Sequence, residues 1–113
     1  MRDADGLSEY LYKVQPTRPQ MLTEGLTPEE DQAVEAHFEY LRDLAEQGVV
    51  LLAGRTRNTD PTSFGIVIFR AGSVESAREM MEGDPAVRAG VFRAELYPYS
   101  IALVGALRDV GPN

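Results

Sequence analysis

The longest regular pattern of hydrophobic and polar positions covers residues 27–48. Its apolar side chains, Val34 and Leu41 among them, fall on one face at about 100° per residue, and charged side chains cover the opposite face. Thr27 is a good N-cap residue, because a proline follows it and a glutamate stands three positions later, as in a capping box. Gly48 is suited to end a helix. The sequence therefore predicts an amphipathic helix between Thr27 and Gly48.

Shorter apolar segments have the pattern of β-strands. Residues 8–14 alternate and include two tyrosines, and residues 49–54 are a short apolar run. Residues 63–71 are apolar at nearly every position from Phe64 to Phe69, which is typical of a strand covered on both faces.

The second half of the chain predicts one more helix and one more strand region. Residues 73–83 have helical spacing, with Ser73 as the N-cap residue. Residues 91–104 predict one long strand or two short ones, because Pro98 lacks a backbone N–H and favours a bulge, a bend or an edge position.

The order of these elements is β-α-β-β-α-β. Short connections and right-handed crossovers favour an α+β ferredoxin-like βαββαβ sandwich, in which two helices cover one face of an antiparallel sheet. The apolar run from Phe64 to Phe69 requires a cover on the second face as well. In so short a chain, a second copy of the same sheet is the simplest cover, so we predict a homodimer with its sheets face to face.

Composition narrows the classes of protein. The 113 residues fit one domain, residues 1–113, with a core at about 8–104 and ends (1–7, 105–113) that we expect to fray. A net charge of −7 without a basic cluster argues against nucleic acid as a partner. The sequence contains no apolar run of about 20 residues and no signal peptide, so we expect no membrane partner. It lacks cysteine, which excludes disulfides and suggests the cytoplasm.

His37, the only histidine, lies within the apolar stripe of the first helix. Two interpretations are open. A lone histidine on an apolar helix face is most often a packed residue whose ring hydrogens are satisfied. It can also serve as a general acid or base, because an imidazole titrates close to physiological pH.

The segment GDPAVRAG (residues 83–90) also has two interpretations. Asp84 is a good N-cap, Pro85 a good first helical residue and Gly90 a good terminator for one helical turn. Alternatively, Asp84 is the carboxylate that orients His37. The predicted fold permits this, because both helices pack on the same face of the sheet.

Other candidates depend less on pattern. The hydroxyl of Ser63 could hydrogen-bond a ligand, although a turn residue is the usual interpretation at a strand start. Arg55 and Arg57 could meet an anionic substrate, or simply lie in a solvated loop. Tyr10 is one of four tyrosines that could line a pocket or the dimer interface, with structural packing as the alternative. One histidine without cysteines predicts no metal site.

Two stretches together resemble the YciI-like, or YCII-related, family of small bacterial proteins. They are HFEYLRDLAEQGVVLLAG (37–54) and DPAVRAGVFRAELYPY (84–99). The matching features are the helix histidine, a glycine eleven residues on, an Ala-Gly at a strand end, and the Asp-Pro and Ala-Gly-Val of the second stretch. The resemblance covers about residues 8–104. Val34, where relatives often carry a basic residue, and Arg55, where many have proline, depart from the pattern.

The resemblance implies a dimeric α+β barrel of ferredoxin-like units and a site built from His37 and Asp84, often accompanied by a serine that corresponds to Ser63. Most members have no assigned reaction. One branch resembles lyases that eliminate chloride from chlorinated hydroxyhydroquinones, and the wider superfamily includes isomerases and monooxygenases.

These observations lead to an enzyme hypothesis and two alternatives. In the first, His37 is a general acid or base, Asp84 holds its tautomer, and a small cyclic or phenolic substrate undergoes elimination or isomerisation without a cofactor. In the second, the same pocket senses a metabolite in a non-catalytic or regulatory dimer. In the third, His37 is only packed and Asp84 only caps a turn.

Overall fold

A computed structural model of the protein describes residues 6–106. Residues 1–5 and 107–113, which include most of the ends expected to fray, lie outside the described range. The elements in chain order are β1 (Ser8–Pro16), α1 (Met21–Glu24), α2 (Pro28–Glu46), β2 (Val50–Arg55), β3 (Gly65–Ala71), α3 (Val74–Glu82), α4 (Pro85–Arg88) and β4 (Phe92–Pro98). Within residues 6–106, no helix combines the length and the hydrophobicity needed to cross a bilayer.

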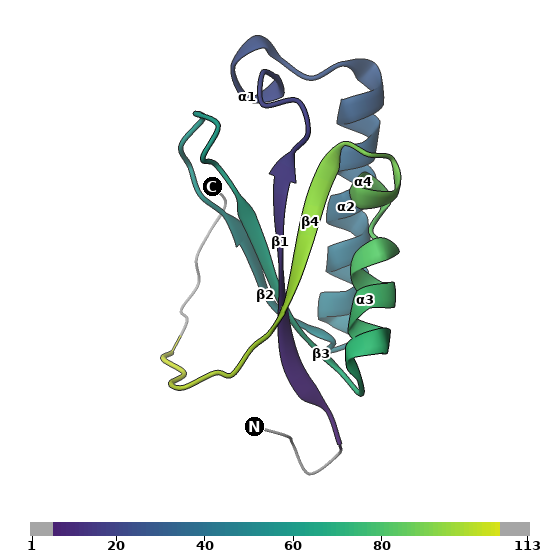
Figure 1. The fold of residues 1–113 in the computed structure, drawn as a ribbon, viewed down its shortest axis with the longest axis vertical. Coiled ribbons are helices and arrows are strands. Elements are labelled where there is room, and N and C mark those ends of the chain that lie inside the picture. The colour runs from purple at the N-terminus through teal and green to yellow at the C-terminus, as the bar shows by residue number, and fades with distance from the viewer. Residues whose placement is uncertain (1–5, 107–113) are drawn as a thin grey trace.

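The strands form one four-stranded antiparallel sheet in the order β2-β3-β1-β4. Helices α2 and α3 lie against one face of this sheet, and within residues 6–106 no helix lies on the other face (Figure 1). This is the predicted α+β ferredoxin-like sandwich, with β1 and β3 in its centre. The position of β4 at one edge agrees with Pro98, which ends that strand.

The predicted helix starts are confirmed by their capping hydrogen bonds. The Glu30 backbone N–H donates to the Thr27 hydroxyl at 3.1 Å, and the Thr27 N–H donates to the Glu30 carboxylate at 2.9 Å. Ser73 accepts from the backbone N–H of Ser76 at the start of α3. Gly48 has a φ of 78°, a left-handed conformation that follows the end of α2 and suits glycine. The four-residue helix α1 was not expected, because its segment reads as a loop.

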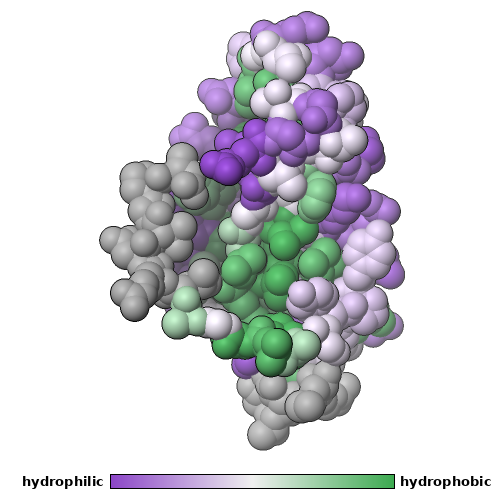
Figure 2. Space-filling model, turned by 90° about the vertical axis from the view of Figure 1, so that its left-hand side faces the viewer, coloured by the Kyte–Doolittle hydropathy of each residue, from purple (hydrophilic) through white to green (hydrophobic). Residues whose placement is uncertain are grey.

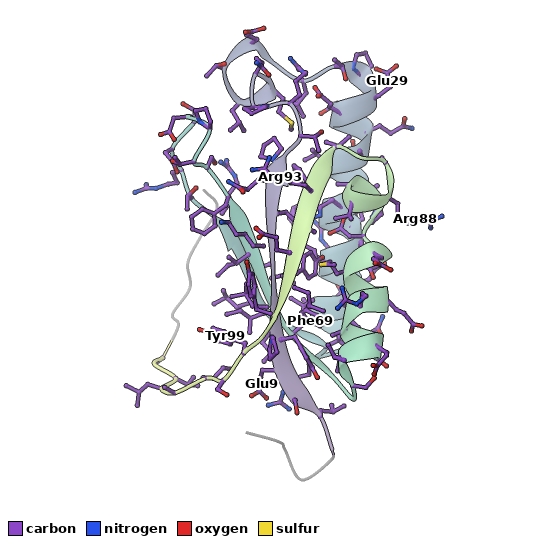
Figure 3. All side chains as sticks on the ribbon, viewed as in Figure 1. Glu9, Glu29, Phe69, Arg88, Arg93 and Tyr99 are labelled. Carbon is purple, nitrogen blue, oxygen red and sulfur yellow. The ribbon has the colours of Figure 1, made fainter. Side chains whose placement is uncertain are left out.

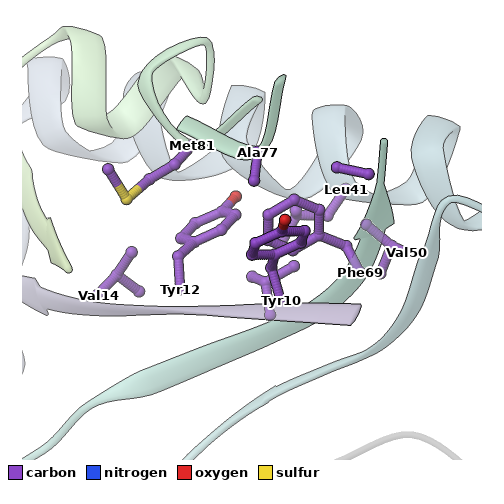
Figure 4. Close-up of a cluster of buried hydrophobic side chains, with 10 residues drawn as sticks. Tyr10, Tyr12, Val14, Leu41, Val50, Phe69, Ala77 and Met81 are labelled. Carbon is purple, nitrogen blue, oxygen red and sulfur yellow. The ribbon is translucent and has the colours of Figure 1, made fainter. Parts of the chain in front are cut away.

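The core lies between the sheet and the helices. Tyr12, Val67 and Phe69 are its largest fully buried apolar or aromatic side chains. Tyr12 and Phe69 project from the two central strands toward the helices (Figure 4). Charged side chains such as Glu29 and Arg88 lie on the outer side of the helices (Figure 3). Burial alternates along β1 and β3, because every second side chain of a strand points to the helices.

The second face of the sheet is only half-covered within one chain. Burial along β3 alternates, so that Ile66 and Ile68 are half-buried while their neighbours toward the helices are buried. Leu11 and Leu52 pair with Ile68 from either side. Figure 2 shows apolar side chains gathered on this side of the molecule. A single copy therefore leaves an apolar surface here, which we call the open sheet face, defined by Leu11, Leu52, Ile66 and Ile68.

Candidate functional site

The structure brings His37 and Asp84 into contact across the 47 residues that separate them in sequence. Helix α2 presents His37 toward the sheet, and Asp84 is the N-cap residue of the helical turn α4. His37 Nδ1 lies 2.7 Å from Asp84 Oδ2. The Asp84 side chain is 0% exposed and that of His37 is 15% exposed. The carboxylate is therefore sealed in the interior, and the imidazole stands between it and the surface.

Three donors surround the Asp84 carboxylate. The backbone N–H of Ala86 donates to Oδ1 at 3.0 Å, which is the capping bond of α4. The Tyr12 hydroxyl donates to Oδ2 at 2.7 Å, and His37 Nδ1 contacts the same oxygen. Capping and contact with His37 are thus not alternatives, because each uses a different oxygen.

The contact defines the two nitrogens of the His37 ring. Because a carboxylate only accepts hydrogen bonds, Nδ1 is the nitrogen that carries the hydrogen in this pair. In the neutral ring, Nε2 then holds the free lone pair. Among residues 6–106, no hydrogen-bond partner contacts Nε2. The ring also packs edge-on against Phe92, with centroids 5.1 Å apart, which fixes its plane.

A cavity of about 660 Å³ lies beside His37. Its lining is mainly apolar and comes from the end of β1, helices α1 and α2, strands β2 and β3, and the start of β4. The apolar wall next to the imidazole includes Val34, Phe38, Leu41 and Phe92. Apolar walls with a few polar groups are typical of small-molecule sites. His37 is the lining residue with an imidazole, the side chain most often used as a general acid or base.

The cavity collects two of the three predicted substrate-binding residues. Ser63 and Arg55 are both in its wall, on the side formed by β2 and the loop before β3. The Ser63 hydroxyl lies 3.3 Å from the hydroxyl of Thr56, so it is held toward the strand end. Arg55 is exposed and available to an anionic group.

Tyr10 does not line this cavity. It is buried in the core beside Phe69, with ring centroids 6.0 Å apart. Tyr10 itself, together with Glu9 and Tyr99, borders a separate depression at the other end of β1. The structure therefore leaves Tyr10 outside the group of residues around His37.

The sequence offered Tyr12 only as one of four tyrosines that could line a pocket or the dimer interface, and its contact with Asp84 was not predicted. Alternation placed Tyr10 and Tyr12 on the same face of one strand, but it could not tell which hydroxyl reaches Asp84. Burial, and next the charge of Asp84, raise the pKa of Tyr12 well above its ordinary value. Burial and the same charge also raise the pKa of Tyr40, whose hydroxyl donates to the Met80 carbonyl at 2.8 Å.

No pattern in the sequence predicted the part of the cavity wall that the loop after β1 supplies. Met21, Leu22 and Leu26 line the cavity from this loop and its short helix α1. In the described part of the chain, no three histidine, cysteine, aspartate or glutamate side chains cluster as metal ligands would.

Comparison with known proteins places this arrangement in a family. No curated protein matches the chain. The structure is similar to that of 5-chloro-2-hydroxyhydroquinone dehydrochlorinase from Burkholderia phenoliruptrix AC1100, solved in complex with 2,5-dihydroxybenzoquinone (TM-score 0.57, 21% identity, 80% of this chain and 93% of that one). It is also similar to an uncharacterized protein from Thermotoga maritima (TM-score 0.53, 14% identity, 83% of this chain and 99% of that one). Both likenesses show the shared fold. Residues 11–99 match the model of the YCII-related domain, so the chain belongs to the YCII-related family.

Proposed function

We propose that this protein is a small-molecule enzyme in which His37 acts as general acid and base. Asp84 holds the tautomer of the imidazole and raises its basicity. The reaction is an elimination or isomerisation of a small cyclic or phenolic compound and uses no cofactor. The observation that supports it is the buried Asp84 carboxylate 2.7 Å behind Nδ1 of a histidine in the wall of an apolar cavity. This arrangement directs basicity to Nε2.

Proton transfer follows from this geometry. Nε2 takes a proton from an O–H or C–H group of the substrate, and the ring becomes an imidazolium whose positive charge faces the Asp84 carboxylate. The electron pair left on the substrate expels a leaving group in an elimination, or shifts the double bond in an isomerisation. In the isomerisation the imidazolium returns the proton to another atom, and in the elimination it releases the proton to solvent. A positioned general base contributes on the order of 10²–10⁴-fold to such a step.

The substrate class is inferred from the lining of the cavity. Its apolar walls suit a ring, while the Ser63 hydroxyl and the Arg55 guanidinium suit hydroxyl or anionic oxygens at its edge. The complex of the structurally similar dehydrochlorinase with 2,5-dihydroxybenzoquinone supports a ring compound of this kind. We further propose that the protein acts in the cytoplasm, in keeping with its lack of cysteine.

We also propose that the working unit is a homodimer joined through the open sheet face. Ile66 and Ile68 are half-buried there, and Leu52 is exposed. Beyond β4, Leu103 and Val104 are 92% and 84% exposed in the single chain. An isologous contact between two such faces would remove this apolar surface from water.

The function is tested by a screen followed by one substitution. Small phenols, quinones and cyclic acids are screened by thermal shift, and hits are followed for product. We expect a hit that the native protein converts, and His37→Asn to reduce turnover by on the order of 10²–10⁴-fold while the variant stays folded. The matched control is Glu35→Gln, an exposed residue two positions away on α2.

Two outcomes would contradict the proposal. Undiminished turnover in folded His37→Asn would remove His37 from the chemistry. Stoichiometric binding of every hit without conversion would favour a metabolite-binding or regulatory dimer instead.

A further inference from the structure

The Tyr12 hydroxyl is the one side-chain donor to Asp84, apart from His37, that residues 6–106 provide. The tyrosine projects from β1 into the layer between sheet and helices (Figure 4). It is absent from the cavity wall, so it has no direct contact with a molecule bound there. We propose that Tyr12 is a positioning residue, which fixes the Asp84 carboxylate so that His37 keeps its hydrogen on Nδ1 and its lone pair on Nε2. This inference rests on the proposed role of His37.

The division of donors between the two carboxylate oxygens supports the assignment. The Ala86 N–H holds Oδ1 from within the helical turn that Asp84 itself starts. Oδ2 receives both Tyr12, from the sheet, and His37, from α2, each at 2.7 Å. Without the Tyr12 hydroxyl, Oδ2 would be held by His37 alone. The carboxylate could then follow the imidazole instead of directing it.

Tyr12 is firmly anchored in the sheet and the core. Its strand is paired on both sides, with Val67 of β3 and Leu96 of β4 opposite Tyr12 itself. Its ring is 1% exposed and meets Phe69 edge-on, with centroids 5.6 Å apart. Such a support holds the hydroxyl in one position beside Asp84.

The phenol also stays a donor. Burial and the charge of Asp84 raise the pKa of Tyr12, so the hydroxyl keeps its hydrogen throughout the range in which an imidazole titrates. Oδ2 therefore always receives a hydrogen from the sheet side. The remaining acceptor capacity of that oxygen is directed at Nδ1.

The single histidine makes the proposal directly measurable. The ¹⁵N NMR shifts of the imidazole report the ratio of the two tautomers, and no assignment is needed because the chain has one histidine. We expect the Nδ1–H tautomer to dominate in the native protein. In Tyr12→Phe, which keeps the ring but loses the donor, we expect the share of the Nε2–H tautomer to rise roughly fivefold, the order of effect of losing one hydrogen bond.

Tyr10→Phe is the matched control. Tyr10 lies two residues away on the same face of β1, is buried beside the same Phe69, and does not contact Asp84. We expect it to leave the tautomer ratio at the native value. Equal spectra for the native protein and a folded Tyr12→Phe would overturn the inference, and so would an equal change in Tyr10→Phe.

A measurement on the native protein covers the case in which Tyr12→Phe fails to fold. Since both donors share Oδ2, the Tyr12 hydroxyl proton and the His37 Nδ1 proton are expected to give a nuclear Overhauser effect. Its absence, with both protons observed, would also overturn the inference. Neither experiment uses a substrate. If the tautomer ratio depends on Tyr12 but no compound is converted, the result therefore contradicts the proposed function and leaves the role of Tyr12 intact.

Discussion

One residue, Asp84, serves the start of α4 and the His37 imidazole at the same time. Its two oxygens accept from Ala86, Tyr12 and His37, and its side chain has no exposure to water. The sequence offered capping and pairing as alternatives, and the structure contains both. The residue should consequently matter for folding as well as for the proposed chemistry.

We predict that Asp84→Ala lowers the free energy of unfolding by about 2–4 kcal/mol, because it leaves buried donors on Tyr12 and Ala86 without an acceptor. Asp84→Asn keeps the shape and a capping oxygen, so its loss should be about 1 kcal/mol. Urea unfolding of the two variants checks this. Equal losses would show that the donors around Asp84 find other partners.

A second prediction at this scale concerns alkaline pH. Because burial raises the pKa of Tyr12, the unfolded chain loses this proton near pH 10 while the folded chain keeps it. The contribution of protonated Tyr12 to the free energy of unfolding is therefore complete below pH 10. It is lost as pH rises above 10, at no more than about 1.4 kcal/mol per pH unit. Tyr12→Phe lacks this loss. The stability advantage of the native protein over the variant should therefore shrink between about pH 9 and pH 11.

Urea unfolding at several pH values measures that difference. Because the other alkaline groups are common to both proteins, they cancel in the comparison. A difference that stays constant through this range would contradict a raised pKa for Tyr12.

At the scale of elements, Arg18 ties the loop between β1 and α2 to the start of α2. Arg18 donates to both carboxylate oxygens of Glu30, at 2.9 and 2.7 Å, and to the carbonyl of Gly25 at 2.8 Å. Glu30 is also the third residue of α2 and part of its capping box. One guanidinium thus joins the loop that carries part of the cavity wall to the start of the helix that carries His37.

We predict that Arg18→Ala speeds amide exchange in residues 21–25, because the carbonyl and carboxylate contacts that hold the loop are lost. Global stability should change little, because the arginine is partly exposed. Hydrogen exchange read by mass spectrometry checks this. The control is Arg42→Ala, whose arginine pairs with Glu39 on the outer side of α2 at 3.6 Å.

The effect of Arg18→Ala on amide exchange should become smaller as pH falls. The Arg18 hydrogen bond, followed by the Thr27 backbone, lowers the pKa of Glu30 from 4.5 to about 2. The contribution of the pair is therefore complete above pH 4.5 and is lost as pH falls toward 2. The difference between native protein and Arg18→Ala should disappear over that interval. A difference that persists at pH 2 would show that the packing of Arg18, and not its charge, holds the loop.

At the scale of the whole molecule, the open sheet face should decide the oligomeric state. Ile68 lies between Leu11 and Leu52 in the middle of this face. We predict that the native protein is a dimer at micromolar concentration and that Ile68→Glu is a monomer, because a charge cannot be buried there without a partner. Light scattering of both measures this. Glu39→Lys, on the helical side, is the control, and a monomeric native protein would contradict the prediction.

The elements were predictable because their signals are local. Helix α2 follows from its apolar stripe and from the capping box at Thr27, both of which lie within one stretch of sequence. The order of strands and helices then favoured one compact topology. Helix α1 was missed because four residues are too few to show a period.

The candidate site was predictable only in part. The resemblance to the YCII-related family paired His37 with Asp84, and Ser63 and Arg55 share the cavity with the imidazole. Tyr10, the predicted substrate-binding tyrosine, borders a separate depression, and Tyr12 makes the contact with Asp84. Strand alternation repeats every two residues, so it cannot tell one inward-facing tyrosine from the next.

With the exception of α1, the sequence by itself determined which segments form helices and strands and which faces they bury, because periodicity and capping act between near neighbours. The tertiary structure alone decided that Asp84 receives donors from β1, α2 and α4 at once. Tyr12 and His37 are 72 and 47 residues away from Asp84 in the chain, and Ala86 is 2 residues away. The first two meet only through strand register and helix packing. His37 therefore obtains its orientation from contacts that no local pattern encodes.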